Sequence, residues 1–127
     1  MINKRFDELT ITEIAELVYL NNCIKGFNSE PDYEKWVATQ MCNLHGEVTE
    51  LWDSHRDGSH NMPCDKEEKL VALGFPAGSL SKEEEEIADI MIRALGYARH
   101  RGINIARAMF VKHSYNVTRP FKHGKKN

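Results

Sequence analysis

The chain has 127 residues, of which 41% are hydrophobic and 28% charged, and this is the composition of a single globular domain covering residues 1–127. Two domains or a long disordered segment do not fit this size. The formal net charge of −2 conceals a segregation, because residues 1–89 carry a net −11 whereas residues 90–127 contain no acidic residue and carry +9.

The cysteines and the N-terminus indicate the cellular setting. Three cysteines at wide spacings, without a C-x-x-C pair, suggest neither a disulfide framework nor a zinc knuckle. The N-terminus lacks an apolar signal segment, and no window approaches the roughly 18 to 20 apolar residues of a membrane span. We therefore expect a soluble, cytoplasmic protein with reduced thiols and no membrane partner.

Four segments show helical periodicity and none shows sustained two-residue alternation, which predicts an all-α fold of four to five helices. The first helix is expected to begin at Thr10 or Thr12 and to end near Gly26. The second is expected to begin after Asp32, its N-cap, and to reach about His55.

The segment 56–80 is rich in Gly, Pro, Ser and Asn and reads as a loop, in which Asp65 to Gly74 could form a short capped helix. A capping-box pattern at residues 81–84 opens the next helix, which ends at Gly102. The last helix is expected over about 104–118. Pro120 stops it, so residues 120–127 are predicted to be a flexible basic tail.

The second helix carries two stripes at 4-3-4-3 spacing. The apolar stripe, which we expect to face the core, consists of Val37, Met41, Leu44, Val48 and Leu51. About 100° around the helix lies a polar seam made of Trp36, Gln40, Asn43, Glu47 and Glu50.

The helix over residues 81–102 repeats this arrangement. Its apolar stripe consists of Ile87, Met91, Ala94 and Ala98, and it is flanked by Glu86, Asp89, Arg93 and Tyr97. If the two helices pack through their apolar stripes, the carboxylates of Glu47, Glu50, Glu86 and Asp89 converge. Like charges at such distances need a counter-charge, and a hard divalent cation such as Mg²⁺ supplies it with oxygen ligands.

Two other interpretations of these acids are open. Acidic pairs at i, i+3 are common on solvated helix surfaces, and Glu13/Glu16 has the same spacing. A di-iron centre would require a Glu-x-x-His pair, which no glutamate of this chain provides. Three further acids, Glu83, Glu84 and Glu85, suit the positive end of the helix dipole.

The basic end of the chain suits phosphate. Lys112, Asn116 and Arg119 are spaced by 4 and 3 residues, so the last helix presents an ammonium, an amide and a guanidinium on one face. Lys125, in the tail, is a weaker candidate for the same role. Solvation or salt bridging to the acidic part of the chain is the alternative.

The order E-x-x-E (Glu47, Glu50), E-x-x-D (Glu86, Asp89) and K-x-x-x-N-x-x-R (Lys112 to Arg119) resembles that of the MazG-like all-α nucleoside triphosphate pyrophosphohydrolases, including the dCTP pyrophosphatase branch. The resemblance extends from Trp36 to Arg119. It departs from the family at Gly46, where many members have Glu, and at Arg93, where that branch often has Tyr.

This resemblance implies an oligomeric MazG-like bundle, a homodimer or homotetramer. It implies Mg²⁺-dependent hydrolysis of a nucleoside triphosphate to the monophosphate and pyrophosphate, with Mn²⁺ as a substitute metal, as a housecleaning activity on the nucleotide pool. The catalytic and metal-binding positions would be Glu47, Glu50, Glu86 and Asp89. The phosphate-binding positions would be Lys112, Asn116 and Arg119, with Lys125 as an addition.

Contacts to the base or sugar are expected from Trp36, Gln40, Asn43 and Arg93, although packing in a core or subunit interface is the favoured explanation for Trp36. A different class of function is a small helical adaptor or nucleic-acid-binding protein that uses the basic C-terminal end. The net −11 of residues 1–89 would repel a long polyanion, so we do not expect nucleic acid as the partner.

Overall fold

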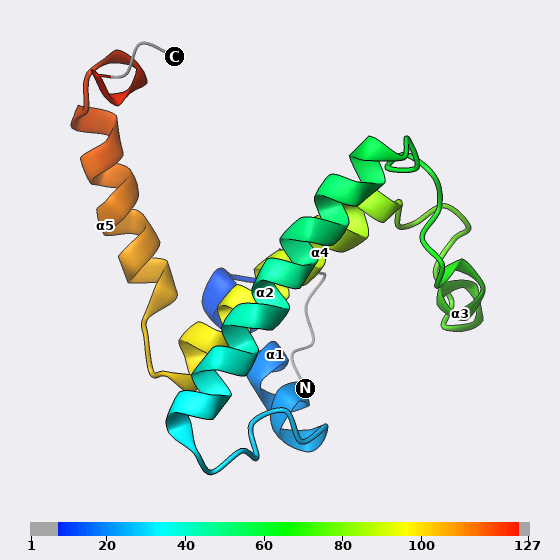
Figure 1. Ribbon diagram of the computed structural model, residues 1–127, viewed down its shortest axis with the longest axis horizontal. Coiled ribbons are helices and arrows are strands. Elements are labelled where there is room, and N and C mark those ends of the chain that lie inside the picture. Colours follow the sequence, from blue (N-terminus) through cyan, green and yellow to red (C-terminus); the bar gives the residue numbers. More distant parts are fainter. Residues whose placement is uncertain (1–7, 125–127) are drawn as a thin grey trace. The chain divides into compact units, whose positions relative to one another are not determined.

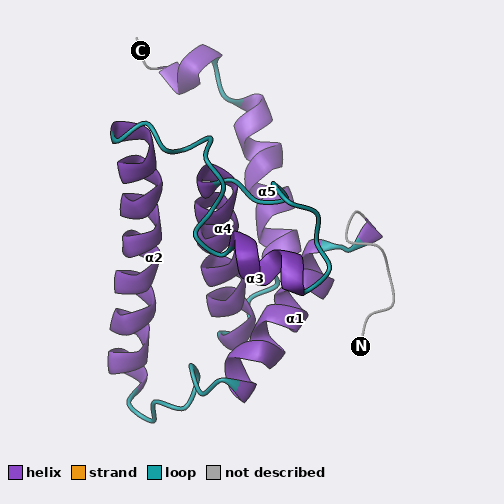
Figure 2. Cartoon of the chain, turned by 90° about the vertical axis from the view of Figure 1, so that its right-hand side faces the viewer, coloured by secondary structure: helices purple, strands orange, loops and turns teal. Residues whose placement is uncertain are grey.

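The computed structural model describes residues 8–124, which form five α-helices and a final 3-10 turn (Figure 1). The elements in chain order are α1 (Ile11–Ile24), α2 (Tyr33–Arg56), α3 (Glu67–Ala72), α4 (Lys82–His100), α5 (Ile105–Thr118) and η2 (Phe121–Gly124). Figure 2 shows helices and loops but no strand in this part of the chain. The all-α prediction is confirmed.

The predicted N-caps explain where three helices begin. Thr10 forms a capping box with Glu13, since its hydroxyl oxygen accepts the Glu13 N–H at 3.1 Å and its own N–H donates to the Glu13 carboxylate at 3.2 Å. Asp32 accepts the Lys35 N–H at 3.1 Å. Ser81 and Glu84 exchange the same pair of bonds at 3.1 and 3.0 Å, so α4 starts where the sequence places it.

The short helix α3 has a different start from the one expected. Asp65 does not cap it: the N-cap position is Lys66, which makes no side-chain capping bond. The Asp65 carboxylate instead accepts a hydrogen bond from the Lys66 ammonium at 2.9 Å. Gly74, at φ +100, follows the helix in a backbone conformation that few other residues adopt.

The chain folds into two compact units. The central unit consists of residues 29–94, with α2, α3 and most of α4, and the terminal unit consists in the described chain of residues 8–28 and 95–124. Helix α4 passes from the central into the terminal unit. No helix in residues 8–124 combines the length and apolar character that crossing a membrane requires.

In the terminal unit, α1 lies against the C-terminal end of α4 at a glycine. A Cβ at Gly96 would lie 2.8 Å from the Asn22 amide nitrogen and 3.1 Å from a Val18 methyl, so the two helices approach closely there. Arg99 donates from Nε to Glu16 at 2.5 Å, and its guanidinium carbon lies 4.3 Å from the centroid of the Tyr19 ring.

In the central unit, α2 and α4 run antiparallel and meet along the polar seam, because Glu47 pairs with Arg93 and His55 pairs with Glu83. The buried residues of α2 are Trp36, Glu47 and Ser54. The expectation that the apolar stripes face the core holds only in part. Those stripes remain partly uncovered, with Val48 49%, Ile87 47% and Met91 44% exposed.

The loop before α4 is held to it by backbone hydrogen bonds. The Cys64 N–H donates to the Leu80 carbonyl at 3.0 Å, and the Lys82 N–H donates to the Met62 carbonyl at 2.9 Å. These bonds place Lys66 and Asp65 beside the first turns of α4. All three cysteines are free thiols, as expected, and Cys64 is the buried one.

Candidate functional site

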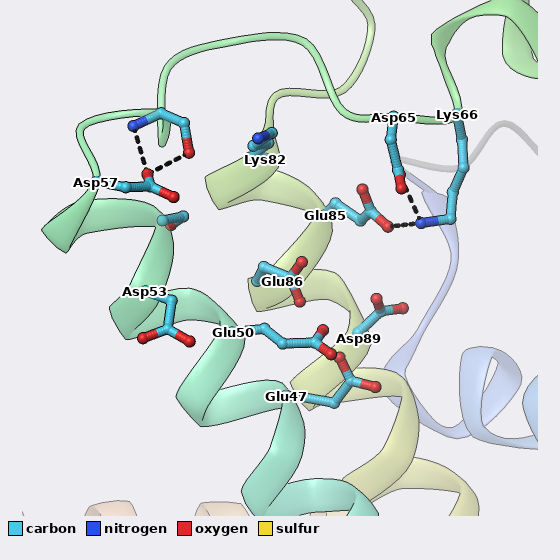
Figure 3. A pocket seen from close by; sticks show the side chains of 12 residues that line it. Glu47, Glu50, Asp53, Asp57, Asp65, Lys66, Lys82, Glu85, Glu86 and Asp89 are labelled. Atoms are coloured by element: carbon cyan, nitrogen blue, oxygen red, sulfur yellow. Dashed lines mark hydrogen bonds and ion pairs between the residues drawn. The ribbon is translucent and has the colours of Figure 1, made fainter.

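Carboxylates from α2 and α4 converge in one cavity of the central unit. Glu47, Glu86 and Asp89 each offer an oxygen, and these oxygens lie within 4.8 Å of one another. Figure 3 shows Glu50 pointing into the same space. This acidic cavity, of about 480 Å³, is lined by Glu47, Glu50, Asp53, Ser54, Asp57, Ser59, Asp65, Lys66, Lys82, Glu85, Glu86 and Asp89.

Two of these carboxylates have a buried oxygen that accepts no hydrogen bond from the described residues. Glu47 is only 8% exposed, and its Oε2 has no hydrogen-bond partner among the residues that the structure describes. The same holds, within residues 8–124, for Oε2 of Glu86. A buried polar atom without a partner is costly, and a divalent cation that prefers oxygen would satisfy both atoms. The donor set thus fits Mg²⁺ or Mn²⁺.

Two cations of the chain, Arg93 and Lys66, form ion pairs with carboxylates of the acidic cavity. Arg93 donates from Nε to Oε1 of Glu47 at 2.8 Å. Lys66 donates to the buried carboxylate of Glu85 and, at 2.9 Å, to Asp65 (Figure 3). These ion pairs neutralise only part of the negative charge, so the cluster remains strongly acidic.

The surrounding negative charge contributes to raised pKa values of two carboxyl groups on α4, Glu86 and Asp89. Burial, a hydrogen bond with Glu50 and the neighbouring carboxylates raise the pKa of Glu86 from 4.5 to about 8. Burial and the charge of Glu47 raise the pKa of Asp89, against the smaller opposing effects of Lys66 and Arg93. In the absence of a bound cation, Glu86 therefore holds a proton at neutral pH.

The sequence interpretation did not include Lys66 and Glu85 in the site. Glu84 caps the helix as expected and Glu83 pairs with His55, but Glu85 lies in the acidic cavity and is 8% exposed. Its position four residues before Asp89 puts the two on one helix face, a signal that could have identified it. No comparable pattern marks Lys66, which reaches the cavity from the loop before α3.

Of the predicted phosphate-binding residues, Lys112 and Asn116 lie on α5 and Arg119 is its C-cap, all in the terminal unit, whereas the carboxylates belong to the central unit. Tyr115 lies between two of these residues, with the Lys112 ammonium 4.8 Å and the Arg119 guanidinium carbon 5.6 Å from its ring centroid. Asn116 has a buried Oδ1 without a hydrogen-bond partner in the described chain. Lys125 lies outside the described residues.

The residues expected at the base or sugar differ in accessibility. Trp36 is 3% exposed, which favours packing inside the central unit over stacking on a nucleobase. Gln40 and Asn43 are partly exposed on the seam. Arg93 is engaged with Glu47.

Comparison of the chain with known protein families, with characterised proteins and with solved structures gives no match. The resemblance to MazG-like enzymes therefore rests on the residues themselves.

Proposed function

We propose that this chain is a cytoplasmic, Mg²⁺-dependent nucleoside triphosphate pyrophosphohydrolase that cleaves its substrate to the monophosphate and pyrophosphate, and that Mn²⁺ can replace Mg²⁺. The observation that carries the proposal is the group formed by Glu47, Glu86 and Asp89, whose oxygens lie within 4.8 Å of one another and include a buried oxygen without a partner in residues 8–124. Housecleaning of the nucleotide pool is the role that this activity suggests.

In this proposal the acidic residues bind the metal ion, and the basic residues of the C-terminal end bind the phosphates. Glu47, Glu86 and Asp89 would hold the cation. Glu50, which was expected among the ligands, lines the cavity but does not belong to this group, and we assign it the orientation of a water molecule. When bound, the divalent cation neutralises charge on phosphoryl oxygens. Lys112, Asn116 and Arg119 bind the β and γ phosphates, for which an ammonium, an amide and a guanidinium are suitable donors.

We propose in addition that the protein is a homodimer or homotetramer. Four large apolar side chains of the central unit, here called the apolar face, are 44 to 61% exposed: Val48, Trp52, Ile87 and Met91. Val48 and Trp52 also line an apolar groove of about 450 Å³ on α2. A second copy of the chain carries the matching apolar face and would cover this one by symmetry.

Hydrolysis of a nucleotide panel with Mg²⁺ tests the proposed activity. Pyrophosphate and a nucleoside monophosphate are the expected products, and their absence, or release of orthophosphate alone, contradicts the proposal. Glu47→Gln and Asp89→Asn should abolish turnover and leave the helix content unchanged. Glu34→Gln is the matched control, because Glu34 is exposed on the same helix and does not line the acidic cavity.

One observation favours the alternative function, binding of nucleic acid. On α5 the half-exposed Tyr115 lies beside Lys112 and Arg119, and such a grouping of an aromatic ring with cations can stack on a base and neutralise phosphates. A salt-sensitive shift of single-stranded RNA or DNA, lost in Tyr115→Ala, together with no turnover of any nucleotide, would establish this alternative.

A further inference from the structure

Arg93 is part of the acidic cluster and not merely its neighbour. It lies one helical turn beyond Asp89 on α4, and its Nε donates to Oε1 of Glu47 at 2.8 Å across the gap between the two helices. The Glu47 side chain is 11% exposed and that of Arg93 is 35% exposed, so solvent screens the pair only in part. A positive charge of the chain thus occupies one side of the cluster permanently, since an arginine stays charged at every working pH.

The ion pair leaves Glu47 with only one oxygen that is not already next to a positive charge of the chain. Oε1 is engaged by Arg93, whereas Oε2 is buried and has no hydrogen-bond partner within the described chain. Two metal ions that act together lie about 3.5–4 Å apart, a distance that a carboxylate spans by giving one oxygen to each ion. The Arg93 guanidinium at Oε1 places a positive charge where a second ion would have to approach that oxygen, so bridging by Glu47 is electrostatically unfavourable. Glu47 can serve a single ion through Oε2.

Glu50 is exposed and is not one of the three carboxylates whose oxygens converge, so it does not offset this restriction. Glu85, the remaining buried acid of the cavity, is bound to Lys66. Glu86 and Asp89 converge with Glu47 on one position, because the three oxygens lie within 4.8 Å of one another. The arrangement provides three oxygens around one point, and both Lys66 and Arg93 act on Asp89 with their positive charge.

We propose that Arg93 takes the place of a second metal ion, so that the cluster binds one divalent cation per chain. This inference rests on the metal site of the proposed function and adds its stoichiometry. Arg93 is a positioning residue in this scheme: it fixes Glu47 so that Oε2 faces the ion. It also supplies near the cluster a charge that would otherwise come from a second metal.

Counting bound Mn²⁺ in the nucleotide-free, full-length protein tests the inference. Calorimetric titration and electron paramagnetic resonance should both give one ion per chain. Arg93→Met frees Oε1 of Glu47 and should raise the count to two. The control is Lys69→Met, which removes an exposed cation of α3 that does not line the acidic cavity and should leave the count at one.

Each outcome bears on a different claim. Two ions in the unaltered protein, or a count of one in Arg93→Met, overturns the inference and leaves the proposed hydrolysis intact if the nucleotide panel gives pyrophosphate. No bound ion overturns the inference and the metal requirement of the proposed function together. Should Arg93→Met fail to fold, the count in the unaltered protein still decides, because two ions there contradict the proposed stoichiometry of one ion per chain.

Discussion

Glu50 of α2 and Glu86 of α4 both point into the acidic cavity (Figure 3), where a side-chain hydrogen bond with Glu50 helps to raise the pKa of Glu86. The two side chains come together because α2 and α4 meet along the polar seam of α2. Burial and the charges of Glu50, Glu85 and Glu47 favour the protonated form of Glu86, whose pKa rises to about 8. The proton is what a bound cation must replace.

The stability of the metal-free protein should decrease as the pH rises from about 4.5 to about 8. Over this interval Glu86 is protonated in the folded chain and ionised in the unfolded chain, so the folded state binds more protons and loses stability as they leave. Thermal unfolding in the presence of a chelator measures the effect as a falling melting temperature. Glu86→Gln should flatten the dependence of the melting temperature on pH, whereas the control Glu68→Gln, at an exposed residue, should not. Equal slopes in the unaltered protein and both variants would contradict the raised pKa of Glu86.

Mg²⁺ should reverse this trend. Glu86 must lose its proton to bind the ion, so the apparent affinity should fall about tenfold for each pH unit below about 8. At a concentration 100 times the dissociation constant, the ion raises the unfolding free energy by about 2.7 kcal/mol. The rise in melting temperature with Mg²⁺ measures this effect. Glu47→Gln should abolish the rise and Glu34→Gln should keep it.

Two helical glycines should respond oppositely to alanine. At Gly46 a Cβ would meet no atom within 4 Å, so Gly46→Ala should raise the unfolding free energy by about 0.5–1 kcal/mol through helix propensity. At Gly96 the Cβ would meet Asn22 at 2.8 Å and Val18 at 3.1 Å, so overpacking of about 1–3 kcal/mol should outweigh the same propensity gain and leave Gly96→Ala destabilised. Denaturant unfolding measures both values, and a stabilised Gly96→Ala variant would show that α1 does not pack tightly on α4.

Local sequence signals predict the helices well, because their origin is local. Thr10, Asp32 and Ser81 cap the helices that they were expected to cap, since each needs only a backbone N–H two or three residues ahead. Asp65 fails as a cap because a charge next to it in the chain, Lys66, competes for its carboxylate. The i, i+3 spacing puts Glu86 and Asp89 on one face of α4, but their convergence with Glu47 depends on how α2 and α4 meet.

Sequence periodicity does not predict which face of α2 and of α4 is buried against the other helix. An apolar stripe predicts burial but does not say against which partner. Ile87 and Met91 remain 47 and 44% exposed, whereas Glu47 of the polar seam is buried. Lys66 enters the cavity through loop hydrogen bonds that no repeat in the sequence encodes. Arg93 has a visible position on the helix, but its pairing with Glu47 depends on how α2 and α4 meet.

The apolar face gives a prediction on assembly. Met91→Glu places a charge on the apolar stripe of α4 and should convert the proposed dimer or tetramer to a monomer, because burying an unpaired carboxylate is costly. Light scattering coupled to gel filtration measures the mass. Met62→Glu is the control, since Met62 is similarly exposed, at 57%, but lies in the loop before α3. A mass of one chain in the unaltered protein contradicts the proposed oligomer.

Lys112 should act on the substrate without affecting the metal. It belongs to α5 and the terminal unit, whereas the cation ligands belong to the central unit, so Lys112→Met should leave the Mn²⁺ count unchanged. Hydrogen bonds to charged groups contribute about 1.5–3 kcal/mol, so loss of this ammonium should lower kcat/KM for a nucleoside triphosphate by roughly tenfold or more. Lys25→Met, at the exposed end of α1, is the matched control. If kcat/KM is unchanged in Lys112→Met, α5 does not bind the phosphates and the role assigned to Arg119 loses its basis as well.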